Sequence, residues 1–430
     1  MKITPAWRVC ILGIILCTAL TGCARTFDDR GGPHFMASLM IAGVAYLLAI
    51  RELLGERSTP RKFPWRMVAF GLLLSAFWHV EFLQLAPGPD DDIHRYVWDG
   101  RVQRLGFNPY VVVPNDPAFE NFHTAETRTL NHPDLPSPYP PGAQLFFRAV
   151  TTFRESVFAM KAAFVVCDLL IVLLLLALLR RHHLGSQMVL AFAWNPLLAI
   201  EVAGSGHIDI VGALFLLISF VALTRRWRTV SVLALGLAIA VKFLPIVLLP
   251  LYWKRIRIRD AALAAITVGV LYLPFLVHGH IPIGSLGTYV QSFRFNDPLF
   301  LVLERVIDPK ILAGFVVLVG FLVAIWMRRK SEDLTAGSFA WPMAVSLLCA
   351  PVVYPWYLLW LIPFILSVST LPIAIWTISI IPTYYVWHLR ILGRPWILPN
   401  WIMLLEYGSI ALSAVVVTKH NLARRVSPQG

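Results

Sequence analysis

The chain has 430 residues, of which 58% are hydrophobic and only 14% are charged. Soluble domains are closer to half apolar and a quarter charged, so this composition excludes an ordinary soluble protein. The net charge of +13 suggests nucleic-acid binding, but the basic residues form short clusters between apolar runs. That arrangement is typical of cytoplasmic loops in membrane proteins. We therefore predict an all-α, polytopic transmembrane bundle in the lipid bilayer, with no nucleic-acid partner.

Apolar runs that match the length of a membrane span, roughly 17–25 residues, recur along the chain. They are predicted at 8–23, 34–50, 66–86, 157–179, 187–203, 208–224, 261–278, 311–327, 338–354, 356–370, 371–387 and 400–418. This gives about twelve spans in a single domain of residues 1–430.

The basic clusters set the orientation, because Lys and Arg are enriched on the cytoplasmic side. The clusters comprise Arg51, Arg57, Arg61, Lys62 and Arg66; Arg180 and Arg181; Arg225, Arg226 and Arg228; Lys254, Arg255, Arg257 and Arg259; Arg328, Arg329 and Lys330; and Arg424 and Arg425. Both termini are then expected in the cytoplasm of a bacterial cell, with the protein in the inner membrane. Residues 87–156 become a large periplasmic loop.

Two segments need separate treatment. The first span ends in LTGC (20–23), which resembles a lipoprotein cleavage box at Cys23, although an ordinary first span has the same composition.

Residues 229–251 lie between two cytoplasmic clusters and are interrupted by Lys242 and Pro245. Each half is too short to cross a core of about 30 Å, so we predict a re-entrant hairpin beside the twelve spans.

Chemistry-bearing residues concentrate just after the third span, in DDDIHRYVWDGRVQRLGFNPY (90–110). The group consists of Asp90, Asp91, Asp92, Arg95, Tyr96, Trp98, Asp99 and Arg101. In a helix, Asp92, Tyr96 and Asp99 share one face, and a neighbouring face carries Arg95. One face offers a carboxylate base and the other a cation. The alternative is a solvated helix held by Asp–Arg pairs, and Tyr139 before two prolines can likewise be part of a rigid turn.

Further candidates lie at the ends of later spans. Lys242 interrupts the predicted hairpin, and an intramembrane ammonium needs a partner or a wet cavity; the alternative is a lysine that snorkels to the interface. A second group, Glu201, His207 and Asp209, is expected at one outer turn. Tyr354 and Trp356 are suited to stacking on a sugar, although aromatic belts at membrane interfaces have the same composition.

Five stretches together resemble one family. They are DDIHRYVWDGRVQRLGFNPY (91–110), NHPDLPSPYPPGAQLFF (131–147), NPLLAIEVAGSGHIDIVG (195–212), GLAIAVKFLPIVLLP (236–250) and PVVYPWYLLWLIP (351–363). In this order they are similar to bacterial GT-C glycosyltransferases, and more narrowly to polyprenyl-phosphate-mannose-dependent mannosyltransferases (glycosyltransferase family 87-like). His94 and Ser205 depart from the pattern, where an aromatic residue and Asn are usual.

The resemblance implies inverting transfer of a hexose, expected to be mannose, from a polyprenyl-phosphate donor to a hydroxyl of a glycan or lipid acceptor on the periplasmic side. Such chemistry needs a base for the hydroxyl proton and cations near the departing phosphate. Matching the motif places the base at Asp91, with Asp92 as an orienting partner or a ligand of a divalent cation such as Mg²⁺ or Mn²⁺. Apart from this cation, no cofactor is expected. The expected substrate-binding residues are Arg95, Tyr96, Asp99, Arg101, Tyr139, Glu201, His207, Asp209, Lys242, Tyr354 and Trp356, with Asp99 and the arginines expected to act mainly as scaffold.

A secondary transporter or flippase of lipid-linked sugars is the competing hypothesis, because broken helices and intramembrane lysines also occur in transporters. The sequence shows no internal repeat, and its polar groups gather in one outer loop. Both features favour the enzyme. A glycan polymerase or ligase is a third possibility, which would share the lipid donor.

Overall fold

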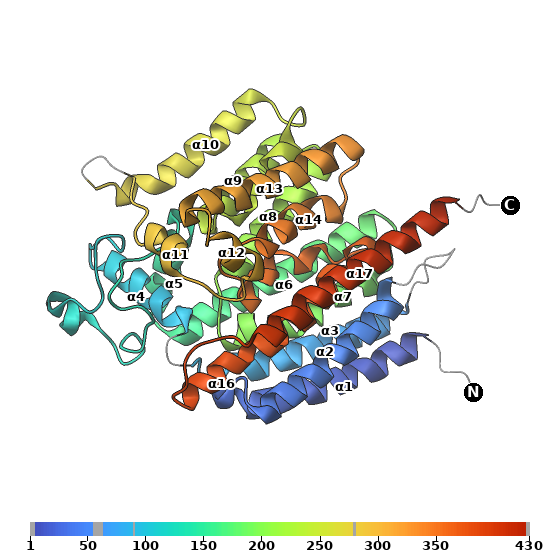
Figure 1. The fold of residues 1–430 in the computed structure, drawn as a ribbon, viewed down its shortest axis with the longest axis horizontal. Coiled ribbons are helices and arrows are strands. Elements are labelled where there is room, and N and C mark those ends of the chain that lie inside the picture. The colour runs from blue at the N-terminus through green and yellow to red at the C-terminus, as the bar shows by residue number, and fades with distance from the viewer. Residues whose placement is uncertain (1–4, 55–62, 89–90, 278–280, 427–430) are drawn as a thin grey trace.

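The computed structural model describes residues 5–54, 63–88, 91–277 and 281–426. Within these ranges all regular structure is helical, apart from one isolated bridge between Phe295 and Val352. The predicted all-α class is therefore confirmed. The helices pack as a bundle, with the two chain ends emerging at one end and α4 (Asp92–Arg104) and α5 (Pro141–Phe153) at the other (Figure 1).

Among the described residues, eight helical segments are long and apolar enough to cross a membrane. They are α1 (Pro5–Arg25), α2 (Pro33–Leu54), α3 (Trp65–Leu83), α6 (Val157–Arg181), α10 (Ile258–Tyr272) with its extension to Phe275, α13 (Pro309–Lys330), the segment Val368–Ile391 that contains α15 (Leu371–Ser379) and α16 (Tyr385–Ile391), and α17 (Asn400–Val426). The multi-pass character expected from the sequence agrees with this set.

The remaining predicted spans are broken or shortened, so the number of straight spans in the described residues is lower than twelve. The run 187–203 is a pair of helices bent by 65°, one ending with α7 (Leu190–Ala193) and the other a π-helix at Leu198–Gly204. The runs 338–354 and 356–370 contain α14 (Ala336–Leu348) and short 3₁₀ turns at Pro355–Trp360 and Ile362–Phe364. Prolines explain these breaks, because each removes a backbone donor and clashes with the preceding turn.

The predicted interruption at Lys242 is present. The helix α8 (Asp209–Thr224) turns into α9 (Arg228–Val241), and α9 ends where Lys242 adopts an extended backbone with φ −155° and ψ 147°. A 3₁₀ segment, Leu244–Tyr252, carries the chain back. The side chain of Lys242 is thereby placed at a helix end.

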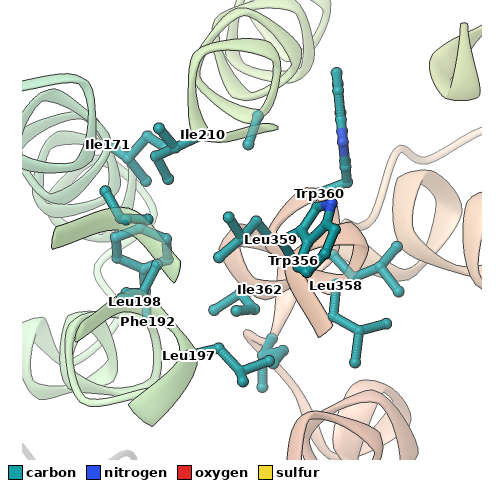
Figure 2. Packing of buried hydrophobic residues seen from close by; sticks show 14 of the residues in the cluster. Ile171, Phe192, Leu197, Leu198, Ile210, Trp356, Leu358, Leu359, Trp360 and Ile362 are labelled. Atoms are coloured by element: carbon teal, nitrogen blue, oxygen red, sulfur yellow. The ribbon is translucent and has the colours of Figure 1, made fainter. Parts of the chain in front are cut away.

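The core beneath α4 is built largely from these irregular segments. Figure 2 shows Trp356, Leu358, Leu359, Trp360 and Ile362 from the 3₁₀ region packing toward residues of the bent pair and α8. Close packing in this region fixes the backbone from which the polar side chains described below project. Shorter helices, α11 (Leu286–Ser292) and α12 (Pro298–Leu303), complete the described structure.

Gly212 tests this packing. A Cβ atom at Gly212 in α8 would lie 1.9 Å from Cη2 of the buried Trp360. Overpacking of a tight core costs about 1–3 kcal/mol, so Gly212→Ala is expected to lower the unfolding midpoint of the detergent-solubilised protein. Gly269→Ala in α10 is the matched control, since a Cβ there meets nothing within 4 Å. Equal midpoints for the two variants would contradict this packing.

Candidate active site

Asp91 sits directly before α4 and is almost fully buried, with 7% exposure. One terminal nitrogen of Arg30 contacts its two carboxylate oxygens at 2.9 and 2.8 Å, and the backbone N–H of Gly88 donates to Oδ2 at 2.8 Å. Arg30 also donates to the hydroxyl of Ser205. Asp91 therefore links the segment between α1 and α2 to α4.

Asp92, the first residue of α4, is only half-buried and has different partners. Tyr139 donates its hydroxyl to Oδ2 at 2.9 Å, and the amide of Asn131 donates to Oδ1. No cationic group lies within 4.0 Å of Asp92 in the part of the chain that is described. Neutral donors thus orient this carboxylate while part of it stays accessible.

Arg95, Asp99 and Arg101 hold the loop together. Arg95 donates to Asp99 at 3.0 Å and to the carbonyl of Leu135 at 2.7 Å, and Asp99 is fully buried. Arg101 instead pairs with Glu155. These contacts agree with the scaffold role expected for the three residues, and they leave Arg101 outside the polar cluster.

Tyr96 and Tyr139 form an aromatic wall behind Asp92. Their rings meet edge to face at 5.1 Å, and Tyr96 stacks on Phe147 at 4.5 Å. Phe147 belongs to α5, so the wall fastens α5 to α4. This packing fixes the Tyr139 hydroxyl that donates to Asp92.

Glu201 and His207 lie together where the π-helix ends. Nδ1 of His207 is 2.9 Å from Oε2 of Glu201, and the hydroxyl of Tyr384 donates to the other carboxylate oxygen. The turn depends on Gly206, whose φ is +78° and whose Cβ would collide with Ile93. Here a glycine is required both for the left-handed backbone and for the approach of α4.

Asp209 and Lys242 form the third buried pair. Nζ of Lys242 lies 2.8 Å from both oxygens of Asp209, and Nε1 of Trp360 donates to Oδ1 at 2.7 Å. Asp209 is fully buried, whereas 21% of the Lys242 side chain is exposed. The ammonium also lies 4.4 Å from the ring centroid of Tyr357. The partner that an intramembrane lysine requires is therefore Asp209.

A stack of four rings connects the later segments. The centroids of Phe295 and Tyr354 are 4.5 Å apart, those of Tyr354 and Trp356 are 4.3 Å apart, and those of Trp356 and His207 are 4.0 Å apart. Tyr354 and Trp356 thus stack mainly on protein rings. The stack holds the His207 imidazole between Trp356 and the surrounding polar groups.

The negative charges of Asp92 and Asp209 both raise the pKa of the same two side chains, Tyr289 and His207. Burial, the largest cause, raises the pKa of Tyr289 well above its usual value, and the charges of both aspartates add to this. Burial favours the neutral form of His207, but Glu201, Asp92 and Asp209 outweigh it and raise the pKa of that ring. Direct contacts connect the same groups, because Ile93 of α4 packs on the Gly206 turn beside His207, His207 stacks on Trp356, and Lys242 lies against the ring of the next residue, Tyr357.

Arg30, Asn131, Tyr384 and Phe295 were not predicted from the sequence. Arg30 carried a signal, because it is a basic residue at the end of the first span opposite the basic clusters. The other three are ordinary residues whose roles arise from tertiary contacts.

The two adjacent aspartates do not converge on a common point, since Asp91 faces Arg30 and Asp92 faces Tyr139. Among the described residues no three His, Cys, Asp or Glu side chains are grouped as metal ligands. A Mg²⁺ or Mn²⁺ site wants several oxygen ligands, and this donor set does not provide them. The residues at this site therefore do not fit such a metal ion.

The fold and the site define a polytopic helical membrane protein with its paired polar groups gathered at one end of the bundle. Residues 17–255, more than half of the chain, match the MptA_B family, described as "Alpha-(1->6)-mannopyranosyltransferase, N-terminal domain". The chain belongs to this glycosyltransferase family, which confirms the resemblance to GT-C mannosyltransferases.

Beyond this family, the similarity of the chain to known proteins is distant. The chain is similar to the crystal structure of ArnT from Cupriavidus metallidurans bound to undecaprenyl phosphate, with 16% identity, a TM-score of 0.45, and coverage of 82% of this chain and 74% of that chain. A likeness at this level supports no argument about function. A comparison with curated proteins gives no match.

The pairing of Arg30 with Asp91 predicts a specific pattern of stability. Removing one partner of a buried ion pair costs about 3–5 kcal/mol, because the other charge remains buried. Arg30→Met is therefore expected to lower the free energy of unfolding strongly, and the double variant Arg30→Met/Asp91→Asn to recover part of the loss. Unfolding titrations in mixed detergent micelles measure both. A double variant no more stable than Arg30→Met would contradict the pairing.

Proposed function

We propose that this protein transfers a mannosyl residue, with inversion, from a polyprenyl-phosphate donor to an acceptor hydroxyl of a glycan or lipid. Its membership of a mannosyltransferase family supports sugar transfer. The observation that carries the mechanism is the partly exposed Asp92 at the start of α4, where the next residue, Ile93, packs on the Gly206 turn beside His207. A base and a cation on one site are what such a reaction requires.

In the proposed step, the acceptor oxygen attacks C1 of the sugar while the bond from C1 to the phosphate oxygen breaks. The bonding electron pair leaves with the polyprenyl phosphate, and the hydroxyl proton passes to a carboxylate. The phosphate is a good leaving group, so a second carboxylic acid of the kind used in glycoside hydrolysis is not needed.

The catalytic pair remains Asp91 and Asp92, as the motif suggests, but the contacts favour different roles within it. Arg30 and Gly88 occupy both oxygens of Asp91, whereas Asp92 is accessible and is held by neutral donors. We therefore assign proton transfer to Asp92 and positioning of the α4 N-terminus to Asp91.

Lys242 is assigned to the departing phosphate. Its ammonium has three donors, and with part of the side chain exposed, not all of them need point to Asp209. Positive charge beside the phosphate is most valuable in the transition state, when negative charge on the leaving group grows. The imidazole of His207 lies beside the same space and is suited to a sugar hydroxyl.

The proposed orientation follows from the basic clusters: the α4 end is periplasmic and both termini are cytoplasmic. In Figure 1 α4 and α5 lie at the end of the bundle opposite both termini. A lipid-linked donor in the outer leaflet would then reach the site from the membrane.

The roles of the two aspartates are separable by kinetics. Asp92→Asn is expected to lower kcat by about 10²–10⁴-fold, the usual contribution of a general base, with donor KM little changed. Asp91→Asn is expected to reduce stability as well as turnover. Transfer of labelled mannose from polyprenyl-phosphate-mannose to membrane extract provides the measurement.

Asp134→Asn is the matched control for this experiment, because Asp134 lies in the same loop and is exposed. It should retain normal turnover. Full activity in Asp92→Asn would overturn the assignment of the base, and unchanged turnover in the Asp91→Asn/Asp92→Asn double variant would overturn the catalytic role of the pair.

Lys242 has its own test. Lys242→Met removes the cation and leaves Asp209 buried, so the variant Lys242→Met/Asp209→Asn is the better probe of donor binding. It is expected to fold and to bind polyprenyl-phosphate-mannose more weakly, because each lost charge-assisted contact contributes about 1.5–3 kcal/mol. Titration of purified protein with the donor measures the change. Unchanged affinity would reduce Lys242 to a structural role.

The transporter hypothesis makes a different prediction. Proteoliposomes containing the protein would show saturable movement of lipid-linked sugar without product formation. Transfer that depends on Asp92 argues against it.

A further inference from the structure

A second charged site lies at the opposite end of the bundle from α4. A cavity of about 370 Å³, wide open to the surface, is present there. Its lining residues are Arg226, Arg228, Thr229, Arg257, Arg259 and Asp260. They come from the turn before α9 and the turn before α10, two helices that pack against each other. None of them takes part in the candidate active site.

The cavity carries uncompensated positive charge. Arg259 lies 3.7 Å from the carboxylate of Asp260. Across the described residues, Arg226, Arg228 and Arg257 have no carboxylate within 4.0 Å. Asp260 is itself engaged, accepting from the Thr229 hydroxyl at 2.8 Å and from the backbone N–H of Arg257 at 3.3 Å. An anion is the ligand that this charge balance favours.

Helix geometry adds to the arginines. The helices α9 and α10 both begin beside the cavity, at Arg228 and Ile258. The first turn of a helix has free N–H groups and a partial positive charge, which favour an anion. At α10, Asp260 in the first turn already accepts from the backbone N–H of Arg257, so the free helix N-terminus is that of α9, which has no acidic residue in its first turn. This end and four guanidinium groups lie around one cavity.

Exposed apolar residues stand next to the lining residues in the chain. Ile258, between Arg257 and Arg259, is 91% exposed, and Trp227, between Arg226 and Arg228, is 53% exposed. Tryptophans in membrane proteins concentrate at the level of lipid headgroups. A ligand with an anionic head and apolar tails matches both the cavity and its surroundings, and a free anion matches the cavity alone.

We propose that this cavity binds the phosphodiester headgroup of an anionic phospholipid, with the acyl chains lying along Trp227 and Ile258. A volume of about 370 Å³ is in the range of small-molecule sites, roughly 300–1,000 Å³, and accommodates a single phosphate with its alcohol. Bound lipid would fasten the two turns together across the α9–α10 contact.

Native mass spectrometry of the full-length protein in detergent tests the proposal, with dioleoyl-phosphatidylglycerol and dioleoyl-phosphatidylcholine as probes. The wild type should bind phosphatidylglycerol more tightly than phosphatidylcholine. The variant Arg228→Gln/Arg257→Gln should lose about 30-fold in that affinity, because each arginine near an anionic lipid contributes about a factor of five. The single variant Arg226→Gln should lose about fivefold in the same affinity. It tests the proposal if the double variant does not fold.

The matched control is Arg329→Gln/Lys330→Gln, which removes the same charge from the last turn of α13. It should bind phosphatidylglycerol with the same affinity as the wild type. An equal loss in the control, or equal binding of the two lipids to the wild type, would overturn the proposal. Displacement of the lipid by an equal concentration of inorganic phosphate would show that the cavity takes a free anion, and would overturn it as well.

Discussion

The arrangement of this protein depends on the pairing of charges that are buried at the end of an apolar bundle. An unpaired ion in such surroundings costs several kcal/mol, and ionisable groups within membrane proteins are therefore paired or face water. Among the described residues, the pairs that meet this constraint include Arg30 with Asp91, Glu201 with His207, Asp209 with Lys242, Arg95 with Asp99, and His79 with Asp168. The pairs Arg30–Asp91 and Asp209–Lys242 also join segments that are 61 and 33 residues apart along the chain. The same contacts that neutralise charge therefore position the site.

The backbone had to break for these pairs to form. A continuous helix through residues 187–203 would not turn Glu201 toward His207, and the 65° bend and the π-helix do so. Similarly, the extended backbone at Lys242 ends α9 and lets its side chain reach Asp209 on α8. Non-helical backbone at membrane depth is tolerated when it is buried in protein. The irregular segments are accordingly among the most buried in the described structure.

The sequence predicts the helical class and the break at Lys242, because these follow from hydropathy and proline chemistry. It also predicts that Asp99 and the arginines act as scaffold, but not that Asp91 and Asp92 face different partners. Pro196 marks the bend within 187–203, but the hydropathy is continuous through it, so the run resembles a single span. Nor does the sequence predict which partner each charge takes. Arg30 reaches Asp91 across 61 residues, and Tyr384 reaches Glu201 across 183, contacts that only tertiary packing determines.

Charge pairing also separates the two halves of the proposed reaction. Asp209 and Lys242 neutralise each other, and Glu201 contacts His207 and raises the pKa of its ring, whereas no cationic group lies within 4.0 Å of Asp92 among the described residues. In the proposed reaction, the lipid phosphate of the donor would be repelled by Asp92 and attracted to Lys242, whose side chain is 21% exposed. The sugar would then lie between the cation and the base. Without Arg30, the Asp91 carboxylate would be uncompensated and would add a second negative charge beside Asp92. We therefore expect the buried pair to contribute to substrate orientation without touching the substrate.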